Sequence, residues 1–160
     1  MSPQTQSVPG LGIDDLRFFT GTWQASGTFF ATPFSDRKPI RMTIQVVPVL
    51  GGSWVQTETA EEATADNPDP LLASYLWGRD AATGRLVAYW FDSSGGRAHE
   101  TSPGWSGDRL VFTGEMTNGG ITFPLRDTFV HIDPDAYQHL GEIDLGQGWI
   151  PVDEESVRRR

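Results

Sequence analysis

The feature of this sequence that most constrains its fold is the regular spacing of turn residues between short runs of strand-forming residues. The chain has 18 glycines and 11 prolines in 160 residues, and they separate the runs instead of gathering in one linker. The runs are rich in Val, Ile, Thr, Trp, Tyr and Phe, which favour β-strands. Ten strands are predicted, at residues 21–30, 40–49, 54–60, 71–78, 85–91, 97–102, 109–115, 121–132, 137–144 and 149–157.

Most turns between these strands are of hairpin length, which is typical of an all-β, up-and-down antiparallel barrel of about ten strands. A sandwich usually needs some long crossovers, and closing the sheet removes exposed edges. One short helix is predicted before the first strand, because Asp14 and Asp15 fit a first turn and Ile13, Leu16 and Phe19 share a face. We expect a flexible segment over residues 1–12 and one barrel domain over residues 13–160.

Composition excludes several classes of function. The chain has no cysteine, so disulfides, a thiolate nucleophile and Cys-based metal sites are ruled out. A net charge of −9 argues against a nucleic-acid partner, which needs clustered Lys and Arg. We see neither a secretory signal nor an apolar run long enough to span a bilayer. The sequence predicts a cytoplasmic monomer or homodimer that binds neither nucleic acid nor membranes.

Alternation of apolar and polar residues predicts which side chains point into the barrel. Four strands have a clearly apolar face: Trp23, Ala25 and Phe29; Ile40, Met42, Ile44 and Val46; Leu110 and Phe112; and Phe123, Leu125 and Phe129, with Asp127 beside them.

The other strands are mixed, and for strands 54–60, 71–78 and 85–91 the pattern leaves the inward face open. A mixed interior is what a ligand cavity with a few polar groups would produce. The candidate ligand-binding residues are Trp54, Gln56, Tyr75, Trp77, Tyr89, Phe129 and His139.

One polar set could carry chemistry. Glu58, Tyr75, His99 and His139 each fall on a face that could be the inner one. A Glu inside an apolar barrel would have a raised pKa and could act as a general acid or base. Glu58 and His99 are therefore the catalytic candidates if the protein is an enzyme. In the alternative, Glu58 faces water and the others form a buried polar network. The three histidines lack metal-like spacing, and we expect no metal and no cofactor.

Short motifs resemble calycin-type barrels. "GTWQASG" after a short helix is similar to the opening of lipocalins, fatty-acid-binding proteins and nitrobindins. "VLGGSWVQTE", "LWGRDAATGRLVAYWFDSSG" and "GDRLVFTGE" resemble an uncharacterised group of bacterial lipocalin-like proteins, over residues 16–158. The shared pieces are Gly78, Asp80, Thr83 and Gly84 in one hairpin, and Trp90, Asp92 and Gly95 in the next.

The resemblance implies a ligand-binding barrel. Nitrobindin-like proteins bind haem through a His near the end of the barrel, but neither His131 nor His139 lies in a matching context. Two functions remain open. One is binding of a small, mostly apolar molecule; the other is a cyclase or isomerase of a natural-product pathway that uses the same cavity.

Further expectations concern charge and the two barrel ends. Arg41, Arg109 and Arg126 fall on outward positions, so a neutral or weakly cationic aromatic or polycyclic ligand is favoured over a fatty acid. Trp23 is predicted to close one end, with Arg158 stacked on its indole. The acidic loop over residues 61–70 is predicted to be mobile and to gate the other end.

Overall fold

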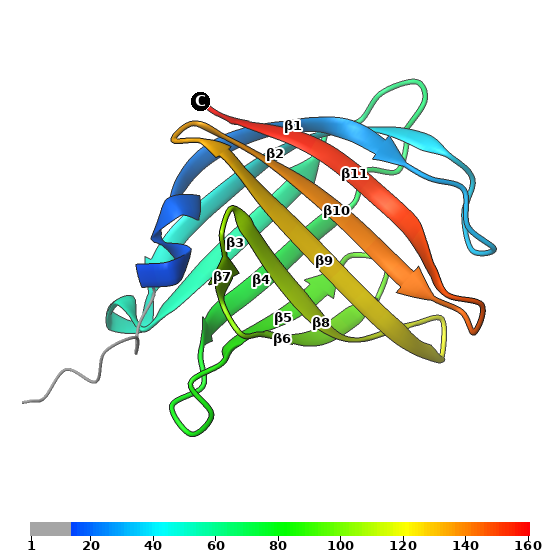
Figure 1. The fold of residues 1–160 in the computed structure, drawn as a ribbon. Coiled ribbons are helices and arrows are strands. Elements are labelled where there is room, and N and C mark those ends of the chain that lie inside the picture. Colours follow the sequence, from blue (N-terminus) through cyan, green and yellow to red (C-terminus); the bar gives the residue numbers. More distant parts are fainter. Residues whose placement is uncertain (1–13) are drawn as a thin grey trace, which may run out of the picture.

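The alternating strand and turn segments fold into a barrel in the computed structural model, which describes residues 14–160 (Figure 1). Within that range the elements are η1 (Asp14–Phe19), β1 (Gly21–Phe29), β2 (Lys38–Val49), η2 (Leu50–Gly52), β3 (Trp54–Glu61), β4 (Leu72–Arg79), β5 (Leu86–Asp92), β6 (Arg97–Ser102), β7 (Trp105–Ser106), β8 (Arg109–Asn118), β9 (Ile121–Asp133), β10 (Ala136–Asp144) and β11 (Trp149–Arg159). The two η elements are 3₁₀-helices.

The sheet closes on itself. Neighbouring strands are antiparallel throughout the described range, β1 pairs with β11, and β6 pairs with β8. The two-residue strand β7 pairs only with β8, so the other ten of the eleven strands form the closed ring. The predicted all-β, up-and-down antiparallel barrel of about ten strands is confirmed. The largest boundary difference is in β8, which runs to Asn118 instead of ending at 115.

The predicted N-terminal helix is present as the short 3₁₀-helix η1. Leu16 and Phe19 lie three residues apart, so a helix with three residues per turn places both on one face. Both are fully buried against the barrel end. Ile13 and the segment over residues 1–12 lie outside the described residues. Between residues 14 and 160, no helix is both long and apolar enough to span a bilayer.

The shared hairpin motifs have a structural explanation. Asp80 accepts a hydrogen bond from the Ala82 amide at 2.8 Å, and Gly84 has a φ of 70°, which favours glycine. In the next hairpin the Trp90 indole donates to Asp92 Oδ2 at 2.8 Å. The other oxygen, Asp92 Oδ1, accepts from the Ser94 hydroxyl and from backbone amides of the turn. These residues fix the turns.

Trp23 closes one end of the barrel, as predicted. Its side chain is fully buried, and its Nε1 donates to the Phe19 carbonyl at 2.8 Å. The stacked arginine is Arg159, whose guanidinium lies 4.0 Å from the indole centroid. The expectation of Arg158 is wrong by one residue, because β11 continues to Arg159 and alternation turns Arg158 outward.

Candidate functional site

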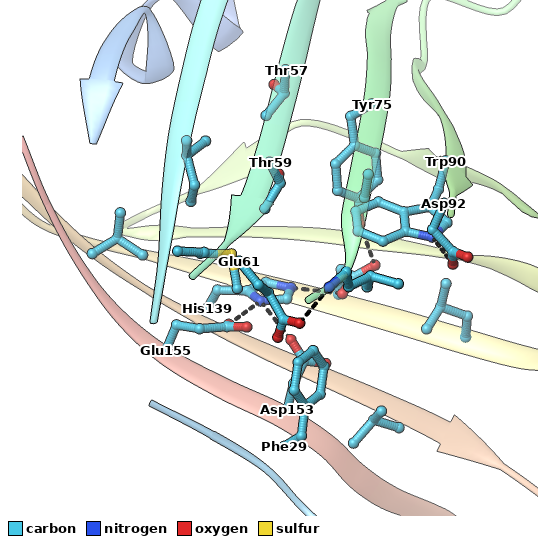
Figure 2. A pocket seen from close by; sticks show the side chains of 18 of the residues that line it. Phe29, Thr57, Thr59, Glu61, Tyr75, Trp90, Asp92, His139, Asp153 and Glu155 are labelled. Atoms are coloured by element: carbon cyan, nitrogen blue, oxygen red, sulfur yellow. Dashed lines mark hydrogen bonds and ion pairs between the residues drawn. The ribbon is translucent and has the colours of Figure 1, made fainter. Parts of the chain in front are cut away.

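The barrel encloses a cavity of about 360 Å³. Its walls are the inward faces of the strands, and aromatic rings make up much of the surface (Figure 2). The lining aromatic residues are Phe19, Phe29, Tyr75, Trp77, Trp90, Phe129 and Tyr137. Carboxylates from several strands gather in one part of this otherwise apolar wall. A β-barrel of this kind can hold a small ligand.

The structure decides the faces that the sequence left open. In β3, Thr57, Thr59 and Glu61 line the cavity, and in β4 the lining residues are Ala73, Tyr75 and Trp77. Of the predicted ligand-binding residues, Tyr75, Trp77, Phe129 and His139 line the cavity.

Trp54, Gln56 and Glu58 do not line the cavity. The Trp54 ring covers Gly78 so closely that a Cβ atom there would lie 2.4 Å from Trp54 Cε3. Glu58 is exposed and accepts hydrogen bonds from Gln56 and Ser74 on the outer surface. The expectation that these three side chains point inward is wrong, because small and polar Thr57 and Thr59 take the inner positions instead.

Tyr89 and His99 also lie outside the cavity. Their rings stack on each other, with centroids 4.8 Å apart. In β5 the inward side is Leu86, Ala88 and Trp90, the opposite of the face that was expected to carry Tyr89. Neither catalytic candidate of the sequence, Glu58 or His99, can therefore act on a molecule held in the barrel.

A cluster of ionisable side chains surrounds His139. Its Nδ1 lies 2.5 Å from Glu155 Oε2 and 3.2 Å from Asp153 Oδ2, and its Nε2 lies 2.6 Å from Asp127 Oδ1. All four residues line the cavity. Both ring nitrogens thus face carboxylate oxygens, which is the arrangement of a doubly protonated imidazolium. We call His139, Asp127, Asp153 and Glu155 the histidine–carboxylate cluster.

Asp127 is the acceptor at the centre of this cluster. Besides His139, the Tyr75 hydroxyl donates to its Oδ2 at 3.3 Å. Glu100, whose side chain is 1% exposed, also lies near Asp127, and its Oε1 is buried without a hydrogen-bond partner among residues 14–160. Two buried carboxyl groups this close to each other do not both ionise readily.

Three adjacent strands position the cluster. Gly141 of β10 pairs with Asp127 of β9 on one side and Asp153 of β11 on the other. A Cβ atom at Gly141 would lie 2.1 Å from Asp153 Oδ1 and 3.4 Å from Asp127 Oδ1. Glycine at this position thus makes room for the carboxylate of Asp153 beside His139, which lies two residues earlier on the same strand.

The protonation states follow from burial and charge. Burial opposes the imidazolium, but the surrounding carboxylates of Glu155, Asp153 and Asp127 outweigh it and hold the pKa of His139 well above its usual value. Burial also opposes ionisation of Asp153, yet the charge of His139 keeps the pKa of Asp153 below its usual value. Burial and the charge of Asp153 raise the pKa of Glu155 well above its usual value.

Burial and the charge of Asp127 also favour the neutral forms of Glu100 and Tyr75. Burial, then the charge of Asp127, raises the pKa of Glu100 well above its usual value. Burial and Asp127 likewise raise the pKa of Tyr75, which remains a hydroxyl donor. The cavity therefore has both proton-donating groups and carboxylate acceptors in its polar part.

A second polar group holds the loop between β3 and β4. Glu61 Oε2 accepts from Lys38 Nζ at 3.2 Å, from the Asn67 side-chain amide at 3.0 Å and from the Leu71 amide at 2.7 Å. Glu61 and Asn67 are both buried. These two residues anchor the loop over residues 61–70 to the barrel, and its predicted mobility and gating role stay predictions.

The three arginines that the sequence placed on outward positions lie outside the cavity. Arg41, Arg109 and Arg126 do not line the cavity, in agreement with the sequence. Arg126 pairs with Glu142 at 2.8 Å and lies 4.4 Å from the centroid of the Trp149 ring. Among the described residues, Lys38 and His139 are the lining side chains that can carry positive charge, and each already has carboxylate partners.

The sequence did not identify Glu100, Asp153 and Glu155 as site residues. Alternation places Glu100 on the other face of β6 from Arg97 and His99. Taking that face as the inner one would have identified Glu100 from the sequence. In β11 the register shifts opposite Gly141 and Glu142, so that Val152 and Asp153 both line the cavity. A bulge of this kind breaks the period-2 pattern and hides the inward face of the strand.

The histidines do not fit a haem ligand. Both nitrogens of His139 already face carboxylates. His131 packs against Phe18, with ring centroids 4.6 Å apart, and does not line the cavity. Haem iron could reach His139 only by displacing the carboxylates that face its two nitrogens, and we derive no chemistry through haem.

Comparisons with known proteins support the fold. No family model matches the chain, and no curated protein matches it either. Among solved structures, the crystal structure of Rv2717c from M. tuberculosis is similar, with a TM-score of 0.74 and 16% sequence identity. The match covers 95% of this chain and 98% of that chain. At this identity, the likeness shows that the two chains share an antiparallel β-barrel fold.

Proposed function

We propose that the barrel binds a small, mostly apolar molecule, neutral or weakly cationic and aromatic or polycyclic, inside its cavity. The observation that carries this proposal is the composition of the cavity wall. Apolar side chains, seven of them aromatic, form most of it, and carboxylates supply the charged groups of its polar part. An anionic ligand would have to approach these carboxylates without an available basic partner, which costs much free energy.

Two further cavity atoms support a ligand with a polar group. Thr57 Oγ1 and Trp77 Nε1 are buried and line the cavity, and neither has a hydrogen-bond partner among residues 14–160. A buried polar atom without a partner costs about 1–3 kcal/mol. A ligand that accepts a hydrogen bond from the Trp77 indole would recover that free energy. A ligand that donates a hydrogen bond to the Thr57 hydroxyl, or accepts one from it, would do the same.

The binding function is tested with N-phenyl-1-naphthylamine, a neutral probe that fluoresces in apolar sites. We expect saturable binding at micromolar concentration. Ala73→Phe fills the cavity and should weaken binding at least tenfold. Leu72→Phe is the matched control, because Leu72 is the preceding residue and is 56% exposed. No saturable binding, or equal binding to both variants, would contradict the proposal.

A second candidate is a cyclase or isomerase acting in the same cavity. The observation that favours it is the cluster around His139, in which protonated and ionised groups face one enclosed space. Such pairs suit general acid–base chemistry on a bound substrate. Turnover of a candidate polycyclic precursor should be lost in His139→Ala and Glu155→Gln while the naphthylamine probe still binds. Unchanged turnover in both variants would exclude these residues.

We also infer that the chain is a distant relative of the lipocalin-like, calycin-type barrels. The order of the shared motifs and the closed barrel support this relationship. A cytoplasmic location and a monomeric or homodimeric state stay predictions; analytical ultracentrifugation tests the second.

A further inference from the structure

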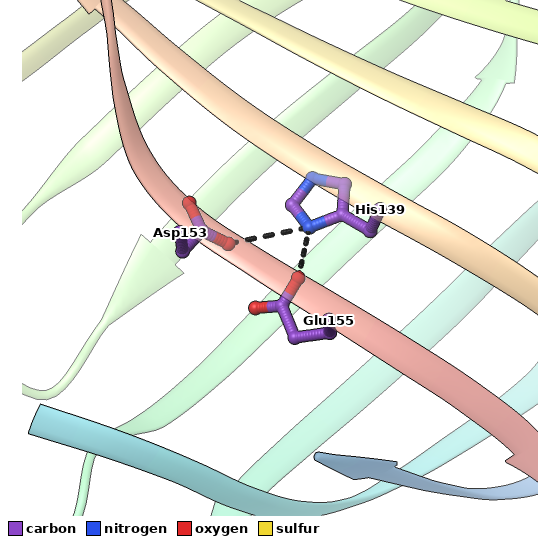
Figure 3. Close-up of side chains that lie close together, drawn as sticks. All are labelled: His139, Asp153 and Glu155. Atoms are coloured by element: carbon purple, nitrogen blue, oxygen red, sulfur yellow. Dashed lines mark hydrogen bonds and ion pairs between the residues drawn. The ribbon is translucent and has the colours of Figure 1, made fainter. Parts of the chain in front are cut away.

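Three side chains of the histidine–carboxylate cluster have the composition of a metal site. His139 Nδ1, an Asp153 oxygen and a Glu155 oxygen all lie within 4.8 Å of one another (Figure 3). One imidazole and two carboxylates are a ligand set that divalent transition metals accept. In a tetrahedral site with bonds near 2.1 Å, ligand atoms lie about 3.4 Å apart. The separation of 3.2 Å between Nδ1 and Asp153 Oδ2 is already close to that value, whereas Glu155 Oε2, at 2.5 Å from Nδ1, has to move outward when the ion replaces the proton between them.

Asp127 orients the imidazole ring of His139 through its Nε2 atom. Asp127 Oδ1 accepts the Nε2 proton at 2.6 Å, and Tyr75 donates to the other oxygen of Asp127. Metal-binding histidines usually donate their second N–H to a carboxylate in this way, which fixes the ring and makes the ligating nitrogen more basic. Here that arrangement leaves Nδ1 facing Asp153 and Glu155, which are the two carboxylates able to join it as ligands.

The negative charge of the cluster and its position on the cavity wall also favour a bound metal ion. One imidazolium faces three carboxylates in the cluster, and Glu61 on the same cavity wall has an oxygen, Oε1, that is buried without a partner among residues 14–160. All three prospective ligands line the cavity, so an ion there would keep a coordination position open toward it. Catalytic metal sites have this form, with three protein ligands and one exchangeable position.

We propose that His139 Nδ1, Asp153 and Glu155 bind one divalent transition-metal ion of the zinc or cobalt class inside the barrel. The ion takes the place of the Nδ1 proton, which is released to solvent on binding. Asp127 acts as a positioning residue by holding Nε2. The ion would share the cavity with the apolar ligand proposed above, because Asp153 and Glu155 also belong to the polar part of its wall.

The test titrates CoCl₂ into chelator-treated protein without a purification tag. We expect one equivalent of Co²⁺ to bind and to give the visible absorption of a four- or five-coordinate site, with Zn²⁺ displacing it. His139→Ala, Asp153→Asn and Glu155→Gln should each weaken Co²⁺ binding at least tenfold. Asp127→Asn should weaken it by about 10- to 100-fold through the histidine orientation.

His99→Ala and Glu58→Gln are matched controls, since both residues lie outside the cavity, and each should bind Co²⁺ as the wild type does. Circular dichroism of the metal-free variants checks folding, and the isosteric Glu155→Gln keeps the test valid if His139→Ala fails to fold. Absence of stoichiometric Co²⁺ binding, or binding unchanged in Glu155→Gln and Asp153→Asn, would overturn the inference. Naphthylamine binding by the metal-free protein reports separately on the proposed ligand cavity.

Discussion

At the scale of single residues, the neighbouring arginines Arg158 and Arg159 near the C-terminal end have different roles. Arg159 lies 4.0 Å from the Trp23 ring centroid and donates to the carbonyls of Thr20, Phe18 and Pro134. Its guanidinium thus connects η1 and the turn before β10 to the closed end. Arg158 is exposed on the opposite face of the strand. The basic sequence at residues 158–160 predicted an inward arginine, but only the observed end of β11 identifies which one.

This difference gives a paired prediction. Arg159→Ala removes the cation–π contact, three hydrogen bonds to backbone carbonyls and the ion pair with Asp135, and should lower the free energy of unfolding by about 2–3 kcal/mol. Arg158→Ala should change it by less than about 0.5 kcal/mol, as is usual for surface substitutions. Urea denaturation measures both. Equal losses in the two variants would mean that Arg159 does not hold the barrel end.

Glu100 predicts a dependence of stability on pH. Because the pKa of Glu100 is raised in the fold, the folded state holds this proton at pH values where the unfolded chain has released it. The unfolded state then binds fewer protons, so stability falls as pH rises from the unfolded pKa through the folded one. Glu100→Gln keeps a neutral side chain of the same shape and removes this loss.

The melting temperature of the variant relative to that of the wild type should therefore rise as the pH is raised above the unfolded pKa of about 4.3, and the two proteins should differ least below it. A gain of about 1 kcal/mol corresponds to roughly 2–4 °C for a chain of this length. Thermal melts followed by circular dichroism across this range provide the measurement. Parallel melting curves for the two proteins would show that Glu100 does not carry the buried proton.

At the scale of the strands, the sequence predicted the inward face wherever one face was apolar. β2 is such a case, with Ile40, Met42, Ile44 and Val46 all buried. The prediction of the inward face failed in β3, where Thr57 and Thr59 face the cavity and Trp54 packs outside on Gly78. A cavity wall is not selected for close packing, so its residues do not show the apolar alternation that a filled core shows.

Gly141 is a second position whose role in the site the sequence did not predict. Nothing in the sequence marks it, yet its missing Cβ makes room for Asp153. Gly141→Ala should displace Asp153 and destabilise the protein by about 1–3 kcal/mol, as other overpacked substitutions do. Adding Asp153→Ala removes the side chain that the new methyl group would meet.

In a double-mutant cycle, the pair Gly141→Ala and Asp153→Ala should therefore show a favourable coupling of about 1 kcal/mol or more. Chemical denaturation of the four proteins gives the cycle. Additive effects would contradict the close approach of these two residues.

At the scale of the whole molecule, fold and site differ in how far the sequence predicts them. Turn residues and strand-forming runs act locally, so the ten-stranded barrel and the closing role of Trp23 could be predicted. The histidine–carboxylate cluster comes from β9, β10 and β11, and its geometry depends on strand register, on Gly141 and on the irregularity in β11. His139 was named as a candidate, but pairwise register was needed to show its partners.

The central claim is that the cavity accepts neutral or weakly cationic apolar molecules and rejects anions. Three compounds of one shape test it: 2-naphthalenemethanol, 2-naphthylmethylamine and 2-naphthoate, each titrated against the fluorescence of the cavity tryptophans Trp77 and Trp90. The account predicts that the alcohol and the amine bind at least tenfold more tightly than the carboxylate, because carboxylates form the polar part of the wall. Binding of the carboxylate as tight as that of the alcohol would contradict it.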